Sequence, residues 1–228
     1  MWVVVGLAAA AAAATGVGVT LATRTAVPPG DTIRRLRSLA AERPHSGLVR
    51  LQLGFALRAR GDEAGARRAW RDAIRVQPDS PAAVRAEDAL HPDEPAGKPP
   101  FIPSFSRPRT GVERLLAQGV AYQAELRPVS AERAFTKAAR AAPDDPEAQT
   151  AAAVGLFDKD RPELAFSRLG PLVRRFPHAQ TVRFHLGLLL IYIRQVQAAR
   201  RELTLAVADG PKTPLARRAR LLLNASKP

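Results

Sequence analysis

Apolar residues recur at the helical spacing of about 3.6 positions along most of this chain, in short segments that end at glycine or proline. A short helix is expected over residues 32–42, and two antiparallel helices over residues 47–80 with a turn at Gly61 and Asp62. A further helix follows over residues 81–90. The same alternation resumes after residue 111 and continues to residue 224. The pattern predicts an all-α protein made of helical hairpins.

The hairpins share a 34-residue register that repeats a glycine, two alanines and a proline at fixed offsets. The four copies are Gly54, Ala66, Trp70, Ala73 and Pro78; Gly119, Ala131, Phe135, Ala138 and Pro143; Gly187, Ala199, Leu203, Ala206 and Pro211; and a weaker copy with Ala153, Ala165, Leu169 and Pro177. Small residues suit the points where two helix backbones approach most closely, and larger residues fill the gaps between them. A repeat of this length indicates stacked helical hairpins, which usually bind other molecules.

Breaks in this pattern divide the chain into five predicted parts. These are a membrane anchor or signal peptide at 1–24, an N-terminal helical block at 31–90 with one repeat at 47–80, a proline-rich linker at 91–111, three repeats at 112–145, 146–179 and 180–213, and a capping helix at 214–225. The capping helix is expected because the last hairpin would otherwise expose its stacking face.

Residues 2–22 carry no charge and are long enough to cross the hydrocarbon layer of a membrane as one helix. No basic residue precedes them, which disfavours a cleaved signal peptide, so a single-pass membrane anchor is predicted. Arginines follow the segment, and the positive-inside rule then places the repeats in the cytoplasm. Small residues at every fourth position, from Gly6 to Gly18, could also pair two such helices in a homodimer.

The linker over residues 91–110 contains six prolines in twenty residues, so neither a helix nor a strand is expected to run through it. It also contains Phe101, Ile102 and Phe105, and such apolar side chains are rarely left in solvent. We expect them to fix the linker onto the helical surface. The alternative is a docking motif for another protein.

The repeated residues resemble the tetratricopeptide repeat (TPR) family, in which Leu-Gly on the first helix is followed by Ala, a large residue, Ala and Pro on the second. The first and last hairpins match best, with Leu53-Gly54 and Leu186-Gly187. The third hairpin is degenerate, with Ala153 for glycine and Pro171 within a helix. The resemblance implies a right-handed superhelical solenoid whose concave wall is built from the first helix of each hairpin.

On that wall the resemblance places a groove that would bind a partner: Leu51, Phe55, Arg58, Leu116, Val120, Gln123, Phe157, Phe184, Leu188 and Ile191. A largely apolar groove suits an amphipathic helix or a hydrophobic peptide of another protein. The alternative is that helices of the array itself, or the linker, fill the groove.

The net charge is +14, divided into +6 over residues 23–110 and +8 over residues 111–228. An even spread of arginine is typical of solvated helix faces, whereas a nucleic-acid interface gathers charge on one face and interleaves aromatics. Nucleic acid is therefore not the expected partner. A basic module that binds nucleic acid or the ribosome is kept as an alternative, as is a secreted soluble repeat protein.

Candidate catalytic chemistry is sparse. The chain has no cysteine, which excludes disulfides and thiolate metal sites, and its four histidines lie apart without metal-ligand spacing. No phosphate-binding glycine loop or nucleophile motif is present in the sequence. We expect no enzyme activity, no metal and no cofactor. The predicted function is that of a membrane-anchored scaffold that binds a peptide or helix of another protein.

Overall fold

A computed structural model describes residues 29–225 of the chain. Over this range it contains eleven α-helices and no strand, which confirms the all-α prediction. The helices are α1 (Pro29–Glu42), α2 (Gly47–Ala59), α3 (Glu63–Val76), α4 (Pro81–Leu90), α5 (Gly111–Ala124), α6 (Pro128–Ala141), α7 (Pro146–Gly155), α8 (Glu163–Arg175), α9 (Gln180–Tyr192), α10 (Val196–Asp209) and α11 (Pro214–Ala225).

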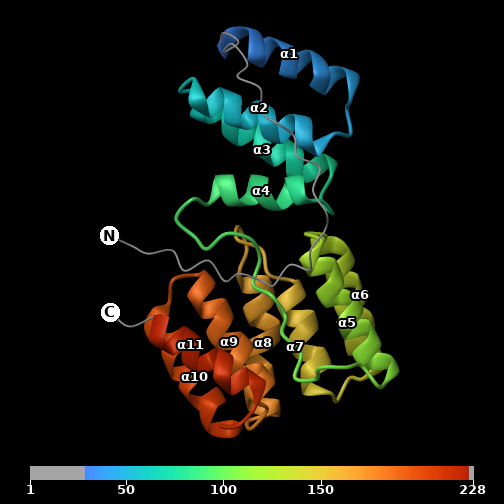
Figure 1. Cartoon of the computed structure of the whole chain (residues 1–228), viewed down its shortest axis with the longest axis vertical. Coiled ribbons are helices and arrows are strands. Elements are labelled where there is room, and N and C mark those ends of the chain that lie inside the picture. The colour runs from blue at the N-terminus through green and yellow to red at the C-terminus, as the bar shows by residue number, and fades with distance from the viewer. Residues whose placement is uncertain (1–28, 226–228) are drawn as a thin grey trace, which may run out of the picture.

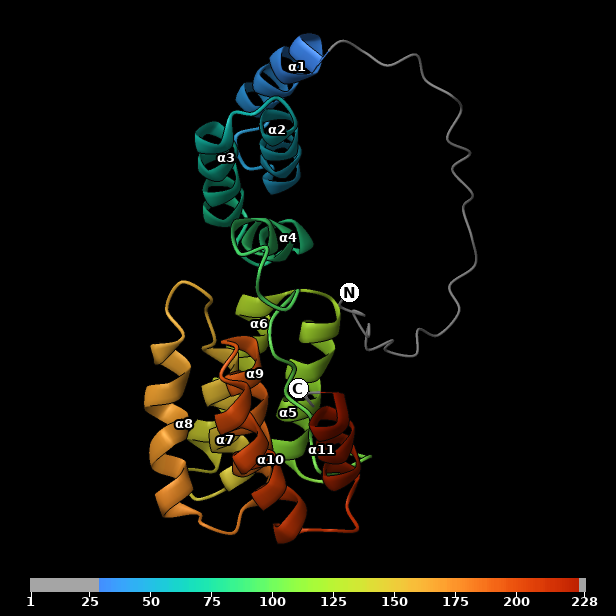
Figure 2. The same cartoon turned by 90° about the vertical axis from the view of Figure 1, so that its left-hand side faces the viewer.

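The helices are arranged in two blocks that are joined by an irregular segment (Figure 1). In the N-terminal block, α1 packs on α2, α2 pairs with α3, and α4 packs on both. In the C-terminal block, the pairs α5 with α6, α7 with α8 and α9 with α10 lie in sequence, and α11 covers the last pair. Figure 2 shows the same two blocks from the side, with α4 facing the C-terminal block.

Short polar side chains begin several of these helices. Ser46, Asp62 and Ser80 each accept a hydrogen bond from a backbone N–H in the first turn of α2, α3 and α4. At the start of α5, Thr110 Oγ1 accepts from the Glu113 N–H at 3.1 Å, and the Glu113 carboxylate accepts from the Thr110 N–H at 3.0 Å. These bonds involve residues close in sequence, so the chain fixes the starts of these helices locally.

The repeated glycines allow the two helices of a hairpin to approach each other. A Cβ atom on Gly54 would lie 2.2 Å from Trp70 Nε1, and one on Gly119 would lie 2.2 Å from Phe135 Cε1. Trp70 and Phe135 are both fully buried, so neither ring can move aside into solvent. Each glycine is therefore required by the large side chain that follows it by sixteen residues.

Replacing Gly119 with alanine is expected to lower the free energy of unfolding by about 1–3 kcal/mol, because the new methyl group overpacks the α5–α6 interface. The matched control is Gly111→Ala at the start of α5, where the nearest atom to a new Cβ is 3.9 Å away. That change should remain within about 0.5 kcal/mol of the wild type. Urea unfolding of both variants measures the difference, and equal midpoints would contradict the close approach.

Each block has its own apolar core. In the N-terminal block the core forms around Trp70 and Leu51. In the C-terminal block one cluster contains Leu116, Phe135, Phe157 and Leu169, and a second contains Phe184, Leu188, Leu203 and Leu215. Phe101, from the segment between the blocks, belongs to the first C-terminal cluster and is 1% exposed.

A buried lysine fastens the N-terminal block to the C-terminal block. Lys159 lies in the connection between α7 and α8, and its side chain is 0% exposed. Its ammonium nitrogen lies 2.8 Å from Asp88 Oδ1 on α4 and 2.8 Å from the carbonyl oxygen of Pro95. The Lys159 charge is therefore held by groups from α4 and from the segment that follows it.

The localisation predicted from the sequence, a single-pass membrane protein, is corrected by the structure. Between residues 29 and 225, no helix has both the length and the apolar character needed to cross a membrane. The predicted span at residues 2–22 lies outside the described residues.

Candidate peptide groove

Residues 97–106, which we call the strap, run across the C-terminal repeats before α5 begins (Figure 1). The strap is extended and irregular, and it contacts side chains from α5, α6, α7 and α9. We call this contact surface the strap groove. The proline-rich linker is thus seated on the helical array of its own chain.

Side chains of the groove bind the main chain of the strap. Gln123 Oε1 accepts from the Phe101 N–H at 2.9 Å, and Gln123 Nε2 lies 3.4 Å from the Pro99 carbonyl oxygen. His185 Nε2 accepts from the Ile102 N–H at 2.9 Å. The Tyr192 hydroxyl donates to the Lys98 carbonyl oxygen at 3.3 Å. Residues from α5 and α9 therefore recognise an extended backbone from two sides.

Two adjacent apolar side chains anchor the strap. The Phe101 ring stacks on the imidazole of His185, with ring centroids 4.9 Å apart, and meets the Phe135 ring edge to face at 5.3 Å. Ile102 packs against the second cluster, which contains Phe184 and Leu188. Fully burying a phenylalanine contributes roughly 1.5–3 kcal/mol from the hydrophobic effect, and the partly buried Ile102 contributes less.

Polar contacts hold both ends of the strap. Lys98 Nζ lies 3.2 Å from Glu87 Oε1 and donates to the Phe157 carbonyl oxygen at 2.8 Å. At the other end, the Ser104 hydroxyl donates to Glu147 Oε2 at 2.8 Å, and the Ser104 N–H donates to the other carboxylate oxygen. Burial raises the pKa of Glu147, although the two hydrogen bonds from Ser104 oppose this shift.

His185 is neutral in this arrangement. Its Nδ1 lies 2.7 Å from the Thr181 carbonyl oxygen, so Nδ1 carries the proton and Nε2 is left to accept from Ile102. The side chain is fully buried, and this burial lowers its pKa to about 4, while the bond to Thr181 opposes the shift. A second proton on Nε2 would face the Ile102 N–H and break the contact.

Acid should therefore destabilise the docked strap. Between pH 6.5, the ordinary His value, and pH 4, the unfolded chain binds a proton at His185 that the folded chain does not. The stabilisation that depends on neutral His185 is fully present above pH 6.5. It is lost as the pH falls towards 4, which lowers the free energy of unfolding by on the order of 3 kcal/mol. His185→Gln retains an acceptor and does not titrate. Unfolding measured from pH 7 to pH 4 should show the extra loss in the wild type only, and parallel losses would contradict it.

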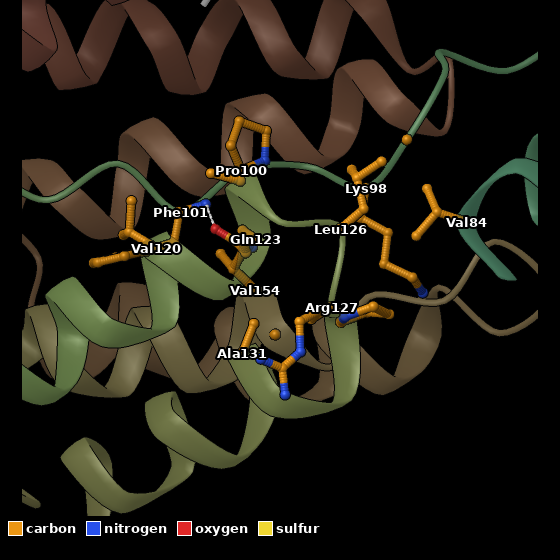
Figure 3. Close-up of a pocket in the computed structure, with 14 residues that line it drawn as sticks. Val84, Lys98, Pro100, Phe101, Val120, Gln123, Leu126, Arg127, Ala131 and Val154 are labelled. Carbon is orange, nitrogen blue, oxygen red and sulfur yellow. Dashed lines mark hydrogen bonds between the residues drawn. The ribbon is translucent and has the colours of Figure 1, made fainter. Parts of the chain in front are cut away.

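An apolar cavity of 290 Å³ lies beside the first half of the strap. Figure 3 shows it between Val84 of α4, the strap residues Lys98, Pro100 and Phe101, and residues of α5 to α7. Its lining includes Val120, Leu126 and Val154. An engineered apolar cavity of about half this volume binds benzene, so the space is sufficient for a large apolar side chain.

The predicted groove residues divide between the two blocks. Seven of them lie near the strap, because they belong to the two apolar clusters that Phe101 and Ile102 contact or lie beside the strap main chain. These are Leu116, Val120, Gln123, Phe157, Phe184, Leu188 and Ile191. The other three, Leu51, Phe55 and Arg58, lie in the N-terminal block, where Leu51 is fully buried and Arg58 lies over the rings of Phe55 and Trp70. Partner binding by these residues stays a prediction.

Three polar residues of the groove were not predicted as site residues: Glu147, His185 and Tyr192. Their contacts to the strap join residues 43 to 94 positions apart, which no local pattern reveals. The one signal was His185 itself, a single ionisable side chain between the apolar residues Phe184 and Leu186. A buried histidine in such a helix needs a partner, and the strap amide supplies it.

The ionisable side chains that contact the strap take part in binding it. Within residues 29–225 there is no group of three or more His, Asp or Glu side chains that could hold a metal ion. The ionisable side chains of the groove, Glu147, His185 and Tyr192, are each engaged with the strap. Burial and the charge of Asp88 raise the pKa of Tyr192 to about 12, so its hydroxyl remains a donor at neutral pH.

The nucleic-acid alternative would need arginines of the helical repeats to converge on one basic face, but the candidate arginines lie in different blocks (Figure 1). Arg67, Arg71 and Arg75 are on α3, whereas Arg200, Arg201, Arg217, Arg218 and Arg220 are on α10 and α11. Some of them bind the protein itself, as Arg75 pairs with Asp72 and Arg220 donates to the Pro211 carbonyl oxygen. This placement does not favour a single basic face.

No protein-family model and no curated protein matches this sequence. Among solved structures, the chain is similar to the TPR2AB domain of yeast Sti1 in complex with pHSP90, with 15% identity, a TM-score of 0.42 and coverage of 86% of this chain and 80% of that one. It is also similar to YrrB, a TPR protein with an unusual peptide-binding site, with 14% identity, a TM-score of 0.38 and coverage of 83% and 99%. Because these similarities are too distant to indicate a function, the function proposed below rests on the groove.

Proposed function

We propose that this chain is a protein-interaction scaffold that binds an extended segment of a partner protein in the strap groove. The observation that carries the proposal is the set of side-chain contacts to the strap main chain, from Gln123 on α5 and from His185 and Tyr192 on α9. Contacts to backbone atoms give affinity for any extended chain, and the apolar clusters select its side chains.

The groove favours an extended segment over a helix. A bound helix satisfies its own backbone N–H groups, and it would leave the partly buried acceptor on Gln123 and the fully buried acceptor on His185 without donors. An extended segment brings those donors, as the strap does. We therefore refine the sequence-based expectation of a peptide or helix to an extended peptide.

Site-specific photo-crosslinking in the native cell tests this function. A benzoylphenylalanine in place of Val120, a half-buried residue on the cavity beside the strap, should crosslink a partner protein. The matched control carries it in place of Arg201, an exposed residue of α10. Crosslinks that depend on position 120 support the groove as the binding site. Crosslinks from position 201 alone, or from neither position, would contradict it.

A further inference from the structure

We infer that the strap is a displaceable ligand held in cis, and that the partner segment which replaces it is an extended chain whose central residues are uncharged, with prolines on both sides of two adjacent apolar residues, the first of them aromatic. This inference rests on the proposed function, because it names the chemistry of the segment that the same groove accepts.

Each backbone donor in the middle of the strap is matched to an acceptor. Between residues 99 and 104, three positions are proline and have no N–H group. The other three, Phe101, Ile102 and Ser104, donate to Gln123, His185 and Glu147 respectively. An N–H group without an acceptor costs about 1–3 kcal/mol when it is buried. A replacing segment therefore benefits from prolines at the same positions.

The side chains of the strap define the rest of the pattern. Phe101 enters a fully buried site between the rings of Phe135 and His185, which fits a flat aromatic group. The site that Ile102 occupies, against the second cluster, accepts an aliphatic side chain. Residues 99–106 of the strap carry no charge. A charged side chain in place of Phe101 would be buried between the rings of Phe135 and His185, which offer it no counter-charge. The groove therefore selects a neutral aromatic–aliphatic pair.

Apart from the buried Phe101 ring, the strap is bound in the manner of a ligand. The strap contributes no helix to the stack, and its contacts to α5, α7 and α9 are made through groove side chains that face an extended chain. Downstream, residues 106–111 are exposed, and this end of the strap is held by the partly buried Phe105 against the first cluster and by Ser104 on Glu147. The 290 Å³ cavity beside residues 97–101 offers a partner segment apolar space that the strap does not use.

A strap held at both ends has a high effective concentration at its own groove, which suppresses binding of a second segment in trans. Weakening the strap should remove this suppression while leaving the groove intact. Phe101→Ala deletes the aromatic anchor and changes no groove residue. Ile102→Ala is a second variant that retains the aromatic anchor. Arg107→Ala, an exposed residue just beyond the strap, is the matched control.

The probe is a fluorescein-labelled peptide with the sequence of residues 97–107, titrated against the full chain and followed by fluorescence anisotropy. We expect the peptide to bind the Phe101→Ala or Ile102→Ala chain at least tenfold more tightly than it binds the wild type or Arg107→Ala. A peptide with alanine at the Phe101 position should bind at least tenfold more weakly. Adding Gln123→Ala to the Phe101→Ala chain should also weaken binding of the unaltered peptide at least tenfold.

Equal affinity for wild type and variants, or binding that ignores Gln123→Ala, would overturn the inference. So would a failure of both strap variants to fold, because the strap would then be a core element. These results are separate from the crosslinking test. A partner crosslinked from position 120, with no peptide bound by the variants, leaves the proposed function standing and removes only the assigned chemistry.

Discussion

Replacing Phe101 with alanine is expected to lower the free energy of unfolding by about 3–5 kcal/mol, as for other buried phenylalanines. The ring is 1% exposed and contacts Phe135 and His185, so its removal leaves a cavity in the core of the C-terminal block. The strap should also detach more often, because its main-chain bonds to Gln123 and His185 depend on the position that the ring fixes.

Two measurements check this prediction. Urea unfolding followed by circular dichroism gives the loss in stability, with Arg107→Ala as the neutral control. Chymotrypsin cleavage after Phe105 reports on detachment of the strap, and it should be faster in Phe101→Ala than in the control under native conditions. Unchanged stability together with unchanged cleavage would show that Phe101 does not hold the strap in place.

Replacing Asp88 with alanine is the second change with a large expected effect. It removes the carboxylate that lies 2.8 Å from Lys159 Nζ and also accepts from the Gly97 N–H at 2.7 Å. Because the Lys159 side chain is 0% exposed, its charge would be left buried without a counter-charge. Breaking a buried ion pair in this way costs about 3–5 kcal/mol.

The chain offers a matched control in the pair of Asp72 with Arg75, whose side chains are 48% and 70% exposed. Asp72→Ala should cost less than about 1 kcal/mol, because water screens the exposed pair. Combining Asp88→Leu with Lys159→Met should recover at least half of the loss, since no buried charge remains. Chemical unfolding of the four proteins measures these differences, and equal costs for Asp88→Ala and Asp72→Ala would refute the buried pair.

Hairpin formation could be predicted from the sequence because the interactions that specify it are close in the chain. Gly54 and Trp70, or Gly119 and Phe135, are sixteen residues apart and belong to one hairpin, so their spacing appears directly in the repeat. The turn at Gly61 could also be predicted, and its φ of +82° is the left-handed conformation that glycine adopts without strain. Leu126 and Arg194 take up similar values at the equivalent turns, which their residue types do not indicate.

The strap groove could be predicted only in part. The apolar side chains of residues 101 and 102 indicated that the linker would dock, and seven of the ten predicted groove residues lie with the strap. The polar half of the site could not be predicted, because Ile102 and His185 are 83 residues apart. The buried Lys159 was missed for the same reason, as its partner Asp88 is 71 residues away on another block.

The amino-acid sequence by itself determined that this chain forms stacked α-hairpins, because helix periodicity, caps and the glycine-to-aromatic spacing act over a few turns of chain. Only the tertiary structure decided what occupies the strap groove of the C-terminal repeats. That outcome depends on a proline-rich segment meeting acceptors on three separate helices, and its free energy comes from contacts that exist only after those helices have packed.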